Sequence, residues 1–220
     1  MTQMLRINPR DPEPALIQEI VTNLQAGQVV AYPTETFYGL GVHVANERAI
    51  KRLFELKRRD VTLPIAILVA DLPMLSRYVI RIPAAARGLM RAFWPGPLTV
   101  LFPAGAAISK ALTTNTGKIG IRISSHPVAT AILSRLGRPI TTTSANLSGF
   151  PASCNVKHVQ KYFGDRLDLI VDGGECPPSL GSTVVDVADE TMAIVRDGAL
   201  AADAVIKCFQ GGDGARTGGP

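Results

Sequence analysis

The chain has 220 residues, of which 46% are hydrophobic and 19% charged, and its formal net charge is +5 at pH 7. Such a composition supports one substantial hydrophobic core. The apolar runs fall short of the roughly 18 residues of a membrane-spanning helix, and the polar N-terminus lacks the apolar centre of a secretory signal. We therefore expect a cytoplasmic protein without a membrane partner, and a charge compatible with nucleotides or RNA.

Helical and strand patterns alternate along the chain. The first half of the chain predicts helices at Pro14–Leu24, 46–57, Leu72–Tyr78 and Pro83–Phe93. Between them it predicts strands at Val29–Tyr32 and Leu63–Val69. The second half predicts helices at Pro127–Leu136, Val156–Tyr162 and Ala201–Phe209. It predicts strands at Leu98–Phe102, Ile119–Ile123, Ile140–Thr143, Leu169–Val171, Thr183–Asp186 and Met192–Val195.

This alternation, with no internal repeat and no long linker, predicts a single α/β domain around a mixed sheet with flanking helices, over residues 1–208. Residues 209–220 are rich in glycine and have no apolar periodicity, so we expect a disordered tail there.

Several familiar motifs are missing from the sequence. It has no P-loop, no dinucleotide-binding glycine fingerprint and no G-x-S-x-G. The cysteines are odd in number and lack a C-x-x-C pair, which favours reduced, buried thiols over disulfides or a structural zinc site: Cys154, Cys176 and Cys208. Three widely spaced histidines have no metal-ligand spacing, so we expect no metal site on the protein and no catalytic histidine.

The segment Pro33–Gly41, PTETFYGLG, follows a predicted strand and carries hydroxyls and two glycines. Loops that follow strands commonly present ligand-binding groups on a rigid scaffold. Thr34 and Thr36 could therefore bind a small polar substrate, and Gly39 and Gly41 would allow its close approach to the backbone. Ordinary turn chemistry explains the segment equally well.

A basic segment follows at residues 47–59, where six cationic and two acidic side chains leave a local excess of four positive charges. Lys57 and Arg59 lie two residues apart, and in an extended or irregular segment such side chains point the same way. They could then converge on one phosphate group, as nucleotidyl transfer requires. A solvated helix face is the alternative.

Hydroxyl-rich and cationic positions recur later in the chain. Thr141–Gly149, TTTSANLSG, presents Ser144 and Asn146 two residues apart, either toward a ligand or within a hydroxyl-rich turn. Arg122 and Arg196 interrupt apolar strands, where a charge needs an anion, either a ligand or a structural salt-bridge partner. Ser182 repeats the hydroxyl at a strand entrance.

Taken in order, PTETFYGLG, KRR, WPGPLT, GIRISSHPVA, TSANLSG, GSTVVD and IVRDG resemble the YrdC/YciO family from about Leu16 to Gly198. The resemblance implies a twisted YrdC/RibB-like sheet with a concave basic face. It further implies synthesis of threonylcarbamoyl-AMP from L-threonine, bicarbonate and ATP with pyrophosphate release. That adenylate serves threonylcarbamoyladenosine formation at position 37 of certain tRNAs, usually through a separate transferase complex.

The resemblance also assigns roles, carried over onto matching positions. The catalytic residues would be Lys57, Arg59, Ser144 and Asn146. Threonine or its carbamoyl group would be held by Thr34, Thr36, Arg122 and Ser182. ATP would be bound by Lys57, Arg59, Asn146 and Arg196. Mg²⁺ would be held mainly through ATP, with no tightly bound cofactor. K-x-R and S-A-N distinguish the chain from YciO-like relatives, and its length resembles the single-domain form.

The chain departs from the family pattern mainly after KRR. Asp60 replaces a proline and would pair with Arg59, while Leu63 and Leu68 stand where polar residues are common in the family. Lys118 stands where a small hydroxyl is common near the nucleotide. Two other functions remain open: a non-catalytic RNA-binding module with the same fold, and carbamoyl or adenylate chemistry on another acceptor.

Overall fold

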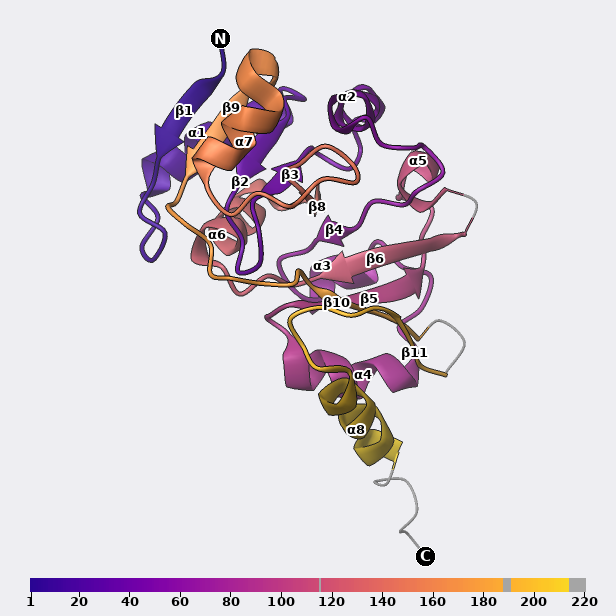
Figure 1. Ribbon diagram of the computed structural model, residues 1–220. Helices are drawn as coiled ribbons and strands as arrows, with labels where there is room; N and C mark the ends of the chain where they lie inside the picture. The colour runs from indigo at the N-terminus through magenta and orange to yellow at the C-terminus, as the bar shows by residue number, and fades with distance from the viewer. Residues whose placement is uncertain (115, 188–190, 214–220) are drawn as a thin grey trace, which may run out of the picture.

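The computed structural model describes residues 1–114, 116–187 and 191–213 (Figure 1). The predicted α/β class is confirmed, but the strands form two mixed sheets where the sequence predicted one. One sheet has five strands in the order β1-β9-β2-β3-β8, and the other has six in the order β11-β10-β5-β6-β4-β7. In Figure 1 the five-stranded sheet lies in the upper part of the molecule, and the six-stranded sheet lies below it, above α4 and α8.

The five-stranded sheet consists, in spatial order, of β1 Gln3–Arg6, β9 Leu169–Asp172, β2 Val30–Tyr32, β3 Gly39–Gly41 and β8 Thr143–Ser144. Its first three strands are parallel, and β3 runs antiparallel to both β2 and β8. β2 is buried along its whole length, because both faces of the sheet are covered.

The six-stranded sheet consists, in spatial order, of β11 Ala193–Arg196, β10 Thr183–Asp186, β5 Leu98–Pro103, β6 Lys118–Arg122, β4 Ile67–Leu68 and β7 Ile140–Thr141. Thr142 separates β7 from β8, so the predicted strand Ile140–Thr143 is divided between the two sheets. The chain therefore passes from one sheet to the other across a single residue.

The α-helices are α1 Pro14–Gln25, α2 Glu47–Lys57, α3 Leu72–Ser76, α4 Ala84–Phe93, α5 Lys110–Thr113, α6 Pro127–Leu136, α7 Val156–Phe163 and α8 Ala202–Asp213. Two separate apolar cores result. α1 and α6 pack on one face of the five-stranded sheet through residues such as Ile20 and Ile132. A larger core joins α2, α4 and α7 to the opposite face and to the second sheet. α4 and α8 lie side by side at one end (Figure 1).

Most predicted elements are confirmed within a few residues, including the Asn46 cap of α2, whose side chain accepts a hydrogen bond from the Ala49 amide at 3.0 Å. Leu63–Val69 yields only the two-residue β4, and β1, β3 and α5 were not predicted. The predicted tail was wrong in its first residues, because α8 continues to Asp213, and residues 214–220 lie outside the described residues. None of the described helices has the length and apolar character to span a membrane.

Candidate functional site

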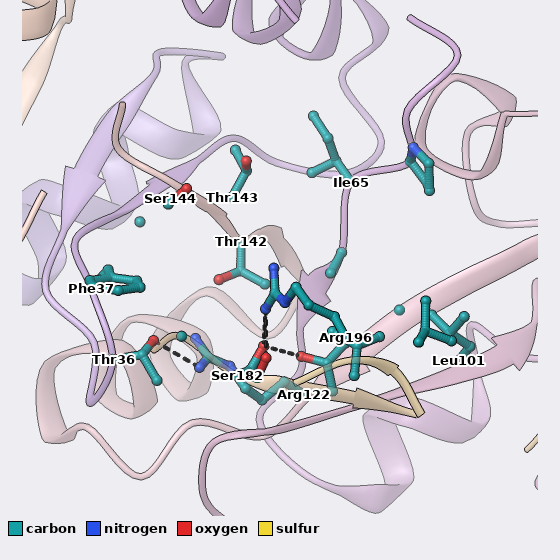
Figure 2. Close-up of a pocket in the computed structure, with 18 of the residues that line it drawn as sticks. Thr36, Phe37, Ile65, Leu101, Arg122, Thr142, Thr143, Ser144, Ser182 and Arg196 are labelled. Carbon is teal, nitrogen blue, oxygen red and sulfur yellow. Dashed lines mark hydrogen bonds between the residues drawn. The ribbon is translucent and has the colours of Figure 1, made fainter. Parts of the chain in front are cut away.

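A cavity of about 750 Å³ opens where the two sheets meet. The five-stranded sheet contributes the β2–β3 loop, with Thr34, Thr36 and Phe37, and Ser144 on β8. The six-stranded sheet contributes residues of β5, β6, β10 and β11, which are a mixture of apolar, polar and charged side chains and one glycine: Thr99, Leu101, Lys118, Gly120, Arg122, Val184, Asp186, Val195 and Arg196. Figure 2 shows side chains from both sheets facing this space.

Hydroxyl groups in the β2–β3 loop form a directed chain of hydrogen bonds. Thr34 Oγ1 donates its only proton to the Phe37 carbonyl at 2.6 Å. Thr36 Oγ1, 3.0 Å from Thr34 Oγ1, must then act as the donor between the two hydroxyls. Thr36 in turn accepts from Arg122 Nη1 at 3.1 Å (Figure 2). The hydroxyl proton of Thr34 therefore stabilises the turn, and Thr36 offers the cavity only an acceptor.

Arg122, the last residue of β6, is 4% exposed and contacts the other sheet through Glu35. Its Nη1 lies 3.3 Å from Glu35 Oε1, and Ser124 Oγ donates to Glu35 Oε2. This ion pair offsets the cost of burying the guanidinium. Its Nε is buried and has no hydrogen-bond partner among the described residues, which leaves a donor for a ligand.

A second polar group surrounds Ser182, at the entrance to β10. Ser182 Oγ accepts from Thr99 Oγ1 at 2.8 Å and from Arg196 Nη2 at 3.0 Å. Arg196 Nη2 also donates to the Ser182 carbonyl at 2.6 Å. Gly198 makes this approach possible, because a Cβ there would lie 2.3 Å from the Ser182 carbonyl carbon. The IVRDG segment thereby packs directly on the Ser182 turn.

Lys57 and Arg59 do not converge as predicted. Lys57 ends α2, and Arg58 adopts a left-handed conformation with φ 49°, so the chain turns between the two cations. Lys57 is 1% exposed and does not line the cavity; its Nζ donates to the backbone carbonyls of Ser144 and, at 2.9 Å, Asn146. Arg59 lines the cavity and donates to the Leu63 and Pro64 carbonyls. The prediction assumed an extended segment, but the helix continues through Lys57.

Burial lowers the pKa of Lys57 to about 7, with a smaller contribution from the charge of Arg59. A neutral amine still has two protons and can donate to both carbonyls. Lys57 therefore positions the backbone on which Ser144 lies, and it does so in either protonation state.

Ser144 and Asn146 also diverge. Ser144 lines the cavity (Figure 2), whereas Asn146 is 6% exposed and its Nδ2 donates to the carbonyls of Leu147 and Phe150. Asn146 Oδ1 is buried without a hydrogen-bond partner among the described residues. The amide closes the Asn146–Phe150 turn in the described structure.

The glycine pair of PTETFYGLG has a packing role that the sequence did not reveal. The ring of Tyr32 on β2 lies over β3, so a Cβ on Gly41 would come within 2.8 Å of Tyr32 Cε1, and one on Gly39 within 3.1 Å of Cζ. The space above the pair is thus filled by Tyr32. The expectation of close ligand approach was wrong for Gly41, which does not line the cavity, whereas Gly39 borders it.

The residues that depart from the family pattern have local explanations. Asp60 accepts from the Thr62 amide and hydroxyl, both at 2.8 Å, and no ion pair with Arg59 is found among the described residues. Leu68 is fully buried in the core and cannot meet a substrate. Lys118 pairs with Asp186 at 2.7 Å on the cavity wall.

The structure thus brings six predicted site residues besides Arg59 to one cavity: Thr34, Thr36, Arg122, Ser144, Ser182 and Arg196. Sequence reasoning missed Thr99 as a site residue, although it lies in the quoted motif WPGPLT, and it missed Glu35 and Asp186. No spacing in the sequence connects these side chains, because Thr99 lies on β5, Glu35 in the β2–β3 loop and Asp186 on β10. The three cysteines are free thiols; Cys176 is buried as predicted, whereas Cys154 and Cys208 are only partly buried, so the prediction of burial was wrong for these two.

The fold and cavity define an α/β protein with an arginine-rich cavity between two sheets. The chain belongs to the Sua5/YciO/YrdC family, because the profile of that family, described as "Telomere recombination", matches residues 22–198. The predicted family is therefore confirmed.

Relatives of which this chain covers about half and relatives of which it covers most both carry the same name. A threonylcarbamoyl-AMP synthase of Pyrococcus abyssi (strain GE5 / Orsay) is 35% identical over 184 residues, 84% of this chain and 54% of that protein. A threonylcarbamoyl-AMP synthase of Vibrio vulnificus (strain YJ016) is 39% identical over 159 residues, 71% of this chain and 86% of that protein. The chain spans about half the length of the Pyrococcus relative, and 56% of a Bacillus subtilis (strain 168) one.

Solved structures show the same likeness. The structure of P. abyssi Sua5 complexed with L-threonine matches with a TM-score of 0.90 and 32% identity, over 94% of this chain and 61% of that one. E. coli YciO matches with a TM-score of 0.85 and 28% identity, over 95% of this chain and 100% of that one. The fold is therefore shared with both the Sua5 and the YciO members of the family.

Proposed function

We propose that this protein is an L-threonylcarbamoyladenylate synthase, which makes threonylcarbamoyl-AMP from L-threonine, bicarbonate and ATP and releases pyrophosphate. It acts in the cytoplasm and supplies the adenylate for threonylcarbamoyladenosine formation on tRNA by a separate transferase. Relatives carrying the synthase name, including one of which this chain covers 86%, and a Sua5 structure complexed with L-threonine support the proposal.

The observation that carries the proposal is the donor-rich, cationic character of the cavity. Arg59, Arg122 and Arg196 all line it, and neither Arg59 nor Arg196 forms an ion pair within the described residues. Burial lowers the pKa of Arg59, and the charge of Arg196 lowers it further. Burial also lowers the pKa of Arg196, with a further contribution from the charge of Arg122. An anionic ligand would relieve this repulsion, and a carbamate together with a triphosphate supplies that charge.

The chemistry assigns a task to each part of the cavity. The threonine amine attacks carbon dioxide, an N–C bond forms, and the amine proton passes to solvent; with bicarbonate a C–O bond also breaks, and the hydroxide leaves with the amine proton as water. A carbamate oxygen then attacks the α-phosphorus of ATP, and the bond to pyrophosphate breaks. Arg59 and Arg196 stabilise the phosphate charge, while Thr36, Arg122 and Ser182 hold the threonine carbamate. Ser144 faces the nucleotide, and Lys57 and Asn146 position its strand.

Mg²⁺ enters this scheme only with ATP. Among the described residues that line the cavity, Asp186 supplies the single carboxylate, and it is paired with Lys118. Mg²⁺ prefers several oxygen ligands and usually takes many of them from phosphates and water. The residues present do not form a metal site, so the ion would be held by the phosphates of ATP, and no step is assigned to it.

Pyrophosphate release, measured with ATP and bicarbonate in the presence and absence of L-threonine, tests the proposal. We expect release that depends on threonine, lowered about 100-fold or more by Arg59→Ala, the order of loss typical for one transition-state donor. Arg58→Ala removes the same charge from the exposed neighbouring residue and should retain activity. Release that needs a different acceptor, or salt-sensitive RNA binding without any turnover, would refute the proposal.

A further inference from the structure

Thr99 is a cavity residue whose hydrogen bond the proposed reaction leaves unexplained. It lies on β5, is 4% exposed and donates from Oγ1 to Ser182 Oγ at 2.8 Å. We propose that Thr99 is a positioning residue that fixes the direction in which the Ser182 hydroxyl donates its proton. The identity of the acceptor, a carboxylate or carbamoyl oxygen of the threonine moiety, rests on the proposed function.

The hydrogen-bonding capacity of Ser182 determines where its proton can point. A hydroxyl has one proton and two acceptor lone pairs. Both lone pairs are taken, one by Thr99 Oγ1 and one by Arg196 Nη2 at 3.0 Å. The proton of Ser182 must therefore point in a third direction, and no acceptor for it is found among the described residues. Ser182 lines the cavity (Figure 2), so its O–H is available to donate to a ligand there.

The position of the Thr99 hydroxyl is itself fixed by packing. β5 lies between β10 and β6, with Thr99 paired to Val184. The methyl group of Thr99 faces Gly120 on β6, where a Cβ would approach it to 3.1 Å. A β-branched side chain has few χ1 rotamers, so the methyl group against Gly120 determines where the hydroxyl points. Gly120 therefore helps to aim the Thr99 hydroxyl at Ser182.

Loss of the Thr99 hydroxyl would free one lone pair of Ser182 and allow its O–H to rotate. Arg196 would stay in place, since its Nη2 also donates to the Ser182 carbonyl at 2.6 Å. The threonine moiety would then lose a pre-oriented donor, whereas the nucleotide would keep Arg196 and Arg59. The effect should therefore fall on the KM for threonine and leave the KM for ATP and kcat nearly unchanged.

The test compares Thr99→Val, which has the same shape without the hydroxyl, with Thr99→Ser, which keeps it. For Thr99→Val we expect the KM for threonine to rise about tenfold, the size of one hydrogen bond, with the KM for ATP and kcat within about twofold. Thr99→Ser should stay within about threefold of wild type. Thr113→Val makes the same change at a buried threonine that does not line the cavity, and should have no effect.

Equal losses in Thr99→Val and Thr99→Ser, or no loss in Thr99→Val, would overturn the inference while leaving the proposed function intact. A wild-type protein without threonine-dependent turnover would instead refute the proposed function. Neutron diffraction of the wild-type protein then decides the inference by itself. We expect the Ser182 deuteron to point into the cavity, and a deuteron donated from Ser182 to Thr99 would overturn it.

Discussion

Replacing Lys57 with methionine tests the electrostatics beneath the cavity. Lys57 is 1% exposed, and burial lowers its pKa from 10.5 to about 7. The folded protein therefore binds fewer protons than the unfolded chain at pH values between these two, so its free energy of unfolding rises with pH in that interval. Methionine has a similar length but does not titrate, so Lys57→Met lacks this contribution.

The magnitude follows from the two pKa values. One proton contributes at most about 1.4 kcal/mol for each pH unit. Folded Lys57 is half protonated at pH 7 and almost neutral at pH 9, whereas the unfolded lysine stays charged at both. The free energy of unfolding of the wild type, relative to Lys57→Met, should therefore rise by about 2 kcal/mol from pH 7 to pH 9. The other titrating groups cancel in this difference.

Urea unfolding at pH 7, 8 and 9, followed by circular dichroism, measures the difference between the two proteins. A difference that stays constant with pH would show that Lys57 keeps an ordinary pKa, and the inference that it lies in a desolvated position would be wrong. NMR titration of the Lys57 Cε resonance in the wild type gives the same pKa without any variant, and serves as the control.

Two further outcomes follow from local geometry. Asp60→Ala should leave the KM for ATP within about twofold of wild type, because Asp60 accepts hydrogen bonds from Thr62 and does not pair with Arg59. A severalfold fall in that KM would show that Asp60 competes with ATP for Arg59. Gly198→Ala should lower the melting temperature and weaken threonine binding, since the new Cβ would meet the Ser182 backbone. Gly88→Ala, where a Cβ meets nothing within 4 Å, should instead raise the stability by up to about 1 kcal/mol, and calorimetry compares the two glycine variants.

The sequence predicted the elements well where the periodicity was strong. α1, α2 and α6 have regular apolar stripes with a capping residue or an N-terminal proline, so local physics specifies them. β3 was missed because glycines have low β-propensity, and the reason for them lies on the neighbouring strand, in the ring of Tyr32. β1 was missed because its pairing partner, β9, lies more than 160 residues away.

The candidate site shows the same limit. Arg122 could be found because a charge in an apolar strand is costly to bury, and it is buried. Arg196 was found by the same reasoning although its side chain is exposed, and Ser182 by its hydroxyl at a strand entrance. The divergence of Lys57 from Arg59 could not be found, since it depends on a left-handed residue between them. Nor could the sequence place Thr99 beside Ser182, because this contact depends on β5 pairing with β10.

The division of the strand region Ile140–Ser144 between two sheets has a consequence for ligand binding. A molecule that contacts both Thr36 and Ser182 connects the β2–β3 loop of one sheet with β10 of the other. A bound ligand then connects the two sheets across their junction. Because it binds only the folded protein, it raises the free energy of unfolding of the whole chain. Saturating substrate should accordingly slow amide hydrogen exchange on both sides of Thr142, and not only at the residues that it touches.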